Sequence, residues 1–298
     1  MLKSPSHVTI GATSVERTAR FFQAFGFARE SDSAIDAFPA RELYGLQGAT
    51  NQTRLSMPGA NRGFLRVVES PLQGITGAPF DRGPRALGIY VREMGPALEI
   101  VKNTRAGIGP VASYTLGPAT IKECQCVGPD GLALVLIEID PRRPSVLDLS
   151  AQAVFSEIQS AVHVVESVDA AAGFWKDTRL EVLLDATFVE PTVAESMHLP
   201  RADTRLRRAV FADDMQLPVR LEMIEFPDPD GRGAVQIDAR PLRPGRFVFG
   251  FEVDDVAAAV KAMPGAAYSK ICRIGRDSVA GGTAPGGVGF ELWSPDDV

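Results

Sequence analysis

The chain has 298 residues, 45% of them hydrophobic, which is enough to bury one large core or two ordinary ones. The formal net charge is -6, with acidic and basic residues interspersed, and no basic patch indicates nucleic-acid binding. The sequence shows neither the apolar segment of a signal peptide nor an apolar run long enough to span a bilayer. Three cysteines in so long a chain argue for a reducing compartment, so we expect a soluble, cytoplasmic, two-domain protein without nucleic-acid or membrane partners.

The first predicted element is a half-buried strand at residues 7–12. His7, Thr9 and a glycine alternate there with Val8 and Ile10, so that the two kinds of side chain lie on opposite faces of the strand. This alternation predicts that one face packs in a core and that the other is available for chemistry.

A helix is predicted directly after this strand. Thr13 and Glu16 fit a capping box at its start, apolar residues recur at helical spacing, and Gly26 ends it. From residue 41 to 71 the pattern changes to short strands, which completes a βαβββ unit.

Three further stretches repeat this order of a strand, a helix and closing strands. Their predicted first strands are residues 87–91, 160–165 and 247–253. Their predicted helices are residues 95–105, 170–176 and 256–263. Their predicted last strands are residues 132–139, 219–226 and 289–293. Segments rich in Gly and Pro at residues 73–84 and 228–245 read as linkers.

The two halves of the chain also match each other, which is typical of internal duplication. The pair Phe21-Phe22 corresponds to Phe174-Trp175, and the segment 65–71 corresponds to 221–227. We therefore predict an α+β fold of four βαβββ modules that pair into two half-barrel domains. The predicted N-terminal domain is 1–143, with modules at about 5–72 and 84–141, and the C-terminal domain is 155–298, with modules at about 157–228 and 245–298.

The His-led strand, the helix that ends in paired aromatics and Gly, and the closing Gly-Pro-Asp-Gly turns resemble the vicinal oxygen chelate superfamily. That family includes glyoxalase I, methylmalonyl-CoA epimerase, extradiol dioxygenases and bleomycin-resistance proteins. The resemblance covers nearly the whole chain and implies that paired modules curl into a cup around a ligand. It also implies a divalent metal held by His or Gln of first strands and Glu of last strands, which would stabilise charge on adjacent substrate oxygens.

The resemblance assigns the ligand positions by register. The first-strand positions of the four modules hold His7, Ala86, Ser160 and Val248, and the last-strand positions hold Arg66, Val135, Glu222 and Glu291. His163 lies three residues after Ser160 and therefore points to the opposite face of its strand.

The extradiol pattern requires His, His and Glu from modules three and four, where this chain has Ser160, Val248 and Glu291. This set disfavours ring cleavage at that site. Pairing of modules one and four would unite His7, Glu291 and Arg66, whereas pairing of modules one and two would leave His7 beside Arg66 alone. Because three or four protein ligands are usual, the count favours the absence of a standard metal site, and the cofactor stays unknown.

Each candidate residue also has a structural alternative. We predict His7 and Glu291 to be metal ligands or a catalytic acid–base pair; otherwise they are a hydrogen-bonded strand His and a solvated Glu. We predict Arg66 and Glu222 to bind substrate, with Arg66 clamping an anionic group; otherwise Arg66 pairs with a neighbouring Glu.

The predicted function is binding of a small, partly apolar organic molecule in a half-barrel cup. Whether the protein is an enzyme stays open, and the enzyme reading is an isomerase or lyase of glyoxalase or epimerase type. The alternatives are a sequestering protein similar to bleomycin-resistance proteins and a former dioxygenase whose C-terminal site has decayed. The expected partner is a small-molecule ligand, and a homodimer is one option for assembly.

Overall fold

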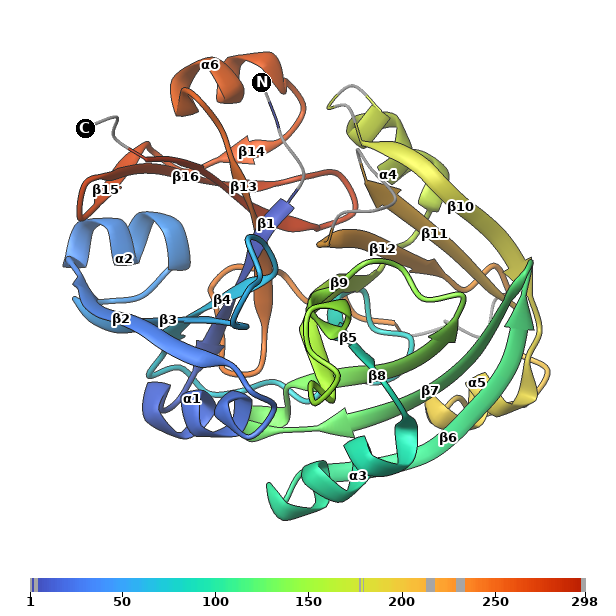
Figure 1. The fold of residues 1–298 in the computed structure, drawn as a ribbon. Helices are drawn as coiled ribbons and strands as arrows, with labels where there is room; N and C mark the ends of the chain where they lie inside the picture. Colours follow the sequence, from blue (N-terminus) through green and yellow to red (C-terminus); the bar gives the residue numbers. More distant parts are fainter. Residues whose placement is uncertain are drawn as a thin grey trace.

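The fold is taken from a computed structural model, and the structure describes residues 2, 5–176, 178, 180–212, 218–228 and 234–295. Its strands form two curled mixed sheets that are accompanied by a few short helices (Figure 1). The α+β class and the half-barrel architecture predicted from the sequence are confirmed. None of the described helices has the length and apolar character needed to cross a bilayer.

Each module begins with a strand and a helix. The first consists of β1 (Pro5–Ala12), α1 (Val15–Gln23), β2 (Ala28–Ile35), α2 (Ala37–Tyr44), β3 (Thr50–Ser56) and β4 (Phe64–Glu69). The second consists of β5 (Gly83–Val91), α3 (Met94–Asn103), β6 (Gly107–Leu116), β7 (Ala119–Val127) and β8 (Ala133–Asp140). The third consists of β9 (Phe155–Val164), α4 (Val168–Lys176), β10 (Glu181–Phe188), α5 (Pro191–Ser196), β11 (Leu206–Ala212) and β12 (Arg220–Glu225). The fourth consists of β13 (Phe247–Glu252), α6 (Val256–Ala262), β14 (Ala267–Tyr268), β15 (Cys272–Ile274), β16 (Asp277–Thr283) and β17 (Gly289–Ser294).

The sheets pair module one with module four and module two with module three. The first sheet has the order β14-β16-β17-β13-β1-β4-β3-β2, with β15 beside β16, and the second has the order β10-β11-β12-β9-β5-β8-β7-β6. The antiparallel pairs β1–β13 and β5–β9 join the modules. The predicted ranges 1–143 and 155–298 therefore do not coincide with the sheets, because each sheet takes one module from each half of the chain.

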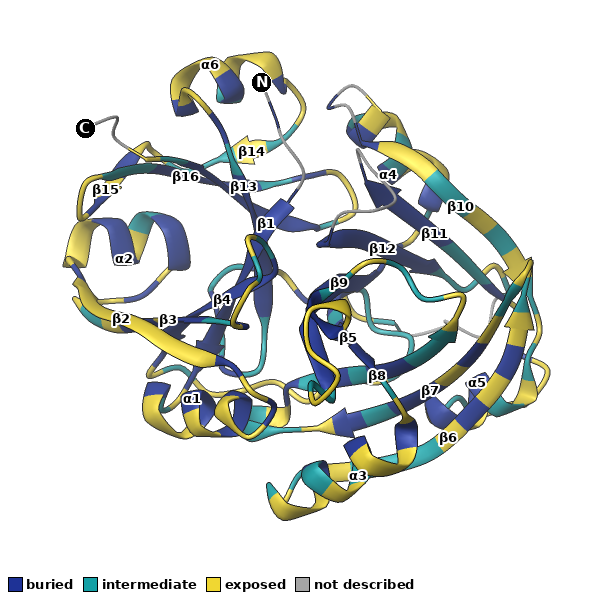
Figure 2. Cartoon of the chain, in the orientation of Figure 1, coloured by how far each residue is buried: buried dark blue, intermediate teal, exposed yellow. Residues whose placement is uncertain are grey.

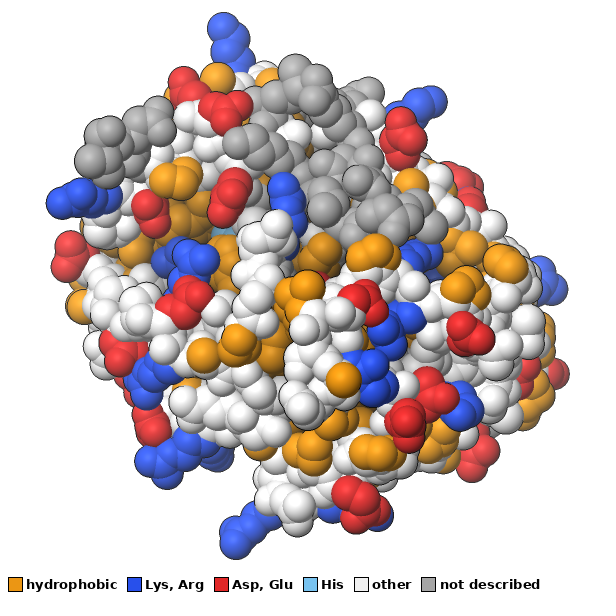
Figure 3. All heavy atoms as spheres, in the orientation of Figure 1, with side chains coloured by type: hydrophobic (Ala, Val, Ile, Leu, Met, Phe, Trp, Pro, Cys, Tyr) orange, Lys and Arg blue, Asp and Glu red, His pale blue; other side chains and the backbone are white. Residues whose placement is uncertain are grey.

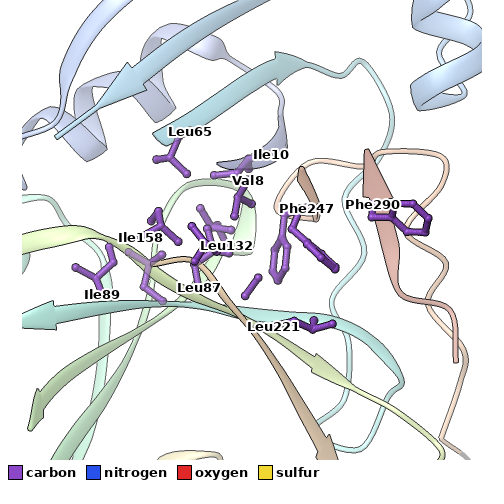
Figure 4. Packing of buried hydrophobic residues seen from close by; sticks show 14 of the residues in the cluster. Val8, Ile10, Leu65, Leu87, Ile89, Leu132, Ile158, Leu221, Phe247 and Phe290 are labelled. Carbon is purple, nitrogen blue, oxygen red and sulfur yellow. The ribbon is translucent and has the colours of Figure 1, made fainter. Parts of the chain in front are cut away.

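The two sheets share one apolar core. Val8 and Ile10 of β1 belong to the same buried cluster as Leu87 of β5, Leu221 of β12 and Phe247 of β13 (Figure 4). The central strands are buried almost throughout, whereas the helices keep one exposed face (Figure 2). Acidic and basic side chains are interspersed over the visible surface (Figure 3). Because successive side chains of a strand point to opposite faces, the residues between these apolar positions face the concave sides of the sheets.

Helix α1 begins one residue later than the capping box predicted. Ser14, rather than Thr13, is the N-cap residue, and its side chain accepts a hydrogen bond from the backbone N–H of Arg17. Thr13 instead donates from its backbone and its hydroxyl to Asp130, in the turn before β8. Tertiary contact between modules one and two thus replaces the predicted local cap. The predicted stop is present, since Gly26 has φ +98°, a left-handed conformation that favours glycine.

Helix α2 was not predicted, because residues 41–71 were interpreted as short strands. Pro39 lies in its first turn, where a missing N–H is tolerated, and Gly45 ends it in the left-handed conformation. Leu43 and Tyr44 are buried in a cluster with Trp293 of β17. The helix therefore depends on packing inside the curve of the first sheet (Figure 1).

Part of the predicted linker at 228–245 is hydrogen-bonded to β1, to Arg82 just before β5 and to α2 rather than being a free connection. Residues 229–233 lie outside the described residues. Further on, the backbone N–H of Ile237 donates to the carbonyl of Arg82 at 2.8 Å, and that of Leu242 donates to the carbonyl of Tyr44 at 2.9 Å. Leu242 is fully buried, so this connection contributes to the packing of the first sheet.

His163 makes stability depend on pH. Its ring is fully buried and lies edge-on to Phe247 and Phe249 of the other sheet. Neither ring nitrogen makes a hydrogen bond of good geometry within the described part of the chain, and a contact with the backbone of Ala161 opposes the effect of burial only in part. Burial lowers the pKa of His163 from 6.5 to about 4. Above pH 6.5, the pKa of histidine in the unfolded chain, His163 is neutral in both states and does not reduce stability. As the pH falls from 6.5 towards 4, the unfolded chain binds a proton that the folded protein does not, so the free energy of unfolding decreases by about 3 kcal/mol.

We expect His163→Leu to flatten this dependence in denaturant titrations between pH 7 and pH 4. His7, whose pKa burial also lowers, will retain part of the slope. The matched control is His198→Asn, because His198 is exposed and has φ 56°, which Asn tolerates. An unaltered slope in His163→Leu would contradict the assignment.

Candidate functional site

The concave face of the first sheet, here called the first cup, brings together three residues singled out in the sequence. They are His7 of β1, Arg66 of β4 and Glu291 of β17. In the strand register, Arg66 of β4 lies opposite Thr9 of β1. Gly250 of β13 lies between the other two residues, opposite Glu291 of β17 on one side and His7 of β1 on the other. This grouping is the one expected from pairing of modules one and four.

His7 is a buried, neutral histidine. Its ring stacks on Phe64 with centroids 4.7 Å apart, and Ser6 Oγ lies 2.8 Å from Nδ1. Its Nε2 lies 3.6 Å from Glu291 Oε2, which is beyond hydrogen-bond distance, and is left without a partner. Burial lowers the pKa of His7, and contact with Glu291 only partly opposes this effect.

Glu291 is a buried, ionised carboxylate. Thr9 Oγ1 and Trp293 Nε1 donate to its Oε2 at 2.9 and 2.8 Å, whereas Oε1 is buried without a partner. Burial alone would raise the pKa of Glu291, but the contact with His7, the charge of Arg66 and the Trp293 N–H together hold it below its usual value.

Arg66 supplies positive charge to the same cup. Its guanidinium carbon lies 3.5 Å from the centroid of the Trp293 ring, and Nη2 donates to Gln52 Oε1 at 2.9 Å. Burial lowers the pKa of Arg66. The ordinary pKa of an arginine is so high that the guanidinium nevertheless stays charged. Its direct partners are thus an aromatic ring and an amide, and its charge acts on Glu291 through space.

Helix α2 fills much of the first cup, which sequence reasoning did not anticipate. Tyr44 is buried with its hydroxyl unpartnered, and burial together with the negative charge of Glu291 raises its pKa well above the usual range. Arg240, from the connection after the second sheet, also has a buried Nη2 without a partner. These groups surround Glu291, so the site is closed on the side of α2.

The donor set of the first cup does not fit a divalent metal ion. The four expected ligand positions hold His7, Glu291, Arg66 and Val248, which supply two ligands and one cation. No group of three or more His, Cys, Asp or Glu with metal-binding geometry occurs among the described residues. A guanidinium at a ligand position would also repel the ion.

The His7 ring occupies the space above Gly250. A Cβ at position 250 would lie 2.1 Å from His7 Cε1, so Gly250→Ala should destabilise the protein by about 1–3 kcal/mol. His7→Ala opens this space, and the Gly250→Ala penalty should therefore be much smaller in that background. Denaturant unfolding of the four proteins in the cycle measures the coupling, and additive effects would contradict the packing.

The second cup, the concave face of the second sheet, contains a cavity of about 460 Å³. Its apolar lining comes from strands of modules two and three and includes Leu116, Ile121, Ile139, Leu184 and Val210. Its polar lining includes Gln159, Ser160, Arg208, Arg220 and Glu222. The second cup therefore offers a mixed apolar and polar space, whereas the first is occupied by α2.

Glu222 lies in the second cup, so the structure does not bring it together with Arg66. Arg208 of β11 pairs with it: Nε lies 2.8 Å from Oε1, and Nη2 donates to Oε2 at 3.0 Å. Nη1 of Arg208 donates to Glu123 Oε1 and to the hydroxyl of Tyr114, at 3.1 and 3.0 Å. Burial acts to lower the pKa of Arg208, but the two carboxylates and Tyr114 raise it well above its usual value. Both oxygens of Glu222 thus have internal partners.

Sequence reasoning missed Arg208 and Arg220. Arg220 precedes Glu222 by two residues in a strand that was predicted from the sequence. Because residues two apart in a strand point to the same face, the spacing could have placed Arg220 beside Glu222. Arg208 belongs to β11, for which no strand was predicted, and its proximity to Glu222 comes from the pairing of β11 with β12. Ser160 faces the cavity, and His163 faces the core, in line with their odd spacing.

The structure is similar to solved structures over nearly its whole length. Glyoxalase I from Zea mays superposes with a TM-score of 0.67 at 13% identity, with 99% of this chain and 92% of that chain covered. A variant of that protein gives 0.66 at 13% identity, with 98% and 94% covered. A candidate dioxygenase from Bacillus subtilis gives 0.67 at 11% identity, with 100% and 87% covered. No family model and no curated protein matches the sequence.

The chain thus has a glyoxalase-like fold. The resemblance noted in the sequence is confirmed at the level of the fold. Identities this low show the fold alone, so activity must be inferred from the residues of this chain.

Proposed function

We propose that this protein binds a small, partly apolar organic molecule in the second cup. The observation that carries the proposal is the cavity of about 460 Å³, a size typical of small-molecule sites. Its apolar wall would hold the body of the ligand, and its polar residues would orient it.

Two unpartnered polar groups support this site. Gln159 Nε2 and Ser160 Oγ are buried, line the cavity and have no hydrogen-bond partner among the described residues. Because a buried polar group without a partner is costly, such groups are expected where a ligand supplies the missing bond.

The binding site can be tested with N-phenylnaphthylamine, a neutral dye whose fluorescence rises in apolar surroundings. We expect saturable binding at one site per chain. Ile139→Trp, which puts a bulky ring into the cavity wall, should abolish the signal. Ile271→Trp, at an exposed position just before β15, should leave it unchanged.

Near-UV circular dichroism and the unfolding midpoint of each variant report whether the fold is kept. The proposal is wrong if the fluorescence does not saturate, or if the Ile139→Trp variant binds the dye as tightly as the wild type.

A second candidate function is proton transfer at His7 and Glu291, as in an isomerase or lyase of glyoxalase or epimerase type. The favouring observation is that His7 Nε2 and Glu291 Oε1 are both buried and unpartnered. Neutral His7 could accept a proton and Arg66 could orient an anionic substrate. Because α2 covers this cup, substrate entry would require the helix to move.

The role of His7 and Glu291 as metal ligands stays a prediction, and metal content tests it. For untagged protein equilibrated with Zn, Ni, Mn or Fe, the two-ligand set predicts weak, substoichiometric binding. Stoichiometric metal that is lost in both His7→Ala and Glu291→Ala would contradict this expectation and support metal-assisted chemistry.

Binding without turnover, as in a sequestering protein, and assembly into a homodimer are retained as proposals. We also propose a cytoplasmic location. It is supported by Cys124, Cys126 and Cys272, which are buried thiols without disulfide partners.

A further inference from the structure

Arg220 of β12 is a buried cation that forms no ion pair with the carboxylates of the described residues. Its side chain is 2% exposed and lines the cavity of the second cup. Its hydrogen-bond partners are neutral: Nη2 donates to Gln159 Oε1 at 2.8 Å and to the hydroxyl of Tyr90 at 3.1 Å. Glu222 and Glu157 act on the charge of Arg220 only through space. Because buried charges are normally paired directly, this guanidinium in a cavity wall indicates that an anion belongs there.

Gln159 is oriented by this contact. Since a guanidinium can only donate, the oxygen of the Gln159 amide must face Arg220. The amide nitrogen therefore points away from Arg220 and makes no hydrogen bond of good geometry among the described residues, although it lies close enough to Glu157 to lower the pKa of that carboxyl. It adds N–H donors beside the cation, and Ser160 Oγ adds a hydroxyl.

Arg143 contributes a second positive charge. It lines the same cavity, and its charge helps burial to lower the pKa of Arg220. No carboxylate of the described residues pairs with either arginine within 4.0 Å, whereas the neighbouring Arg142 is paired with Asp148.

We propose that the second cup selects organic molecules that carry a carboxylate, which Arg220, Gln159 and Arg143 bind while the apolar wall holds the rest. The inference rests on the proposed binding site and names the class of its ligand. The guanidinium fork of Arg220 matches the two oxygens of a carboxylate.

A carboxylate is favoured over a phosphate or phosphonate group because negative charge is already present across the cavity. Glu222 and Glu123 line it as well and share the single guanidinium of Arg208. A second negative charge on the ligand would be repelled by this cluster, while one charge is balanced by Arg220 and Arg143.

The experiment is competition against N-phenylnaphthylamine. The probes are octanoate, decanoate and phenylbutyrate, each with its primary amide and its phosphonate of the same length. We expect the carboxylates to displace the dye at least roughly tenfold more tightly than the amides, and more tightly than the phosphonates.

Arg220→Met should weaken carboxylate binding roughly tenfold or more relative to the binding of the matching amide by the same variant. Arg143→Met, at a half-exposed position where folding is not at risk, should weaken it by a smaller factor in the same direction. Arg276→Met, at an exposed position in the turn between β15 and β16, removes the same charge and should have no effect.

The outcomes separate the two proposals. If the dye does not bind, the proposed function fails and this inference fails with it. If the dye binds but amides compete as well as carboxylates, or both cavity variants bind carboxylates like the wild type, the site stands and carboxylate selection is wrong. Tighter binding of phosphonates would assign the cations to a doubly charged group instead.

Discussion

The structure depends on the two faces of its central strands. On β1, Val8 and Ile10 enter the core shared by both sheets, while His7 and Thr9 enter the first cup. On β9, Ala161 enters that core and Ser160 enters the second cup. A shift of register by one residue would exchange core and cup side chains along the whole strand, at the cost of many buried apolar contacts. Packing of the core therefore fixes which residues line each cup.

This constraint explains which features the sequence could predict. Alternation and spacing are local, so the four modules and the cup positions of His7 and Glu291 could be recognised. The partner of each module could not, because the pairing of β1 with β13 is decided by contacts between distant residues. Helix α2 could not be predicted for the same reason. It is short, and it is stabilised by the tertiary packing of Leu43 and Tyr44.

The two cups differ in how the negative charge of a buried glutamate is compensated. Each holds a buried last-strand glutamate, and a buried carboxylate requires compensating positive charge. In the first cup, Arg66 acts on Glu291 from a neighbouring module, and α2 closes the space. In the second, Arg208 forms a close pair with Glu222 within the same module, and the remaining space stays open beside Arg220. Among the described residues, α2 thus occupies the first cup, whereas the second cup keeps a cavity.

The nested order of the modules also affects how the chain can fold during synthesis. All strands of the second sheet lie between Gly83 and Glu225. The first sheet instead places β1 beside β13 and β13 beside β17, which ends at Ser294. The second cup can therefore assemble while the ribosome is still translating the last module. Until that module emerges, β1 lacks β13 beside it, and its polar backbone groups on that side have no ladder partner. For the nascent chain, the exposed flank of β1 is the place where pairing with another chain would compete with correct assembly.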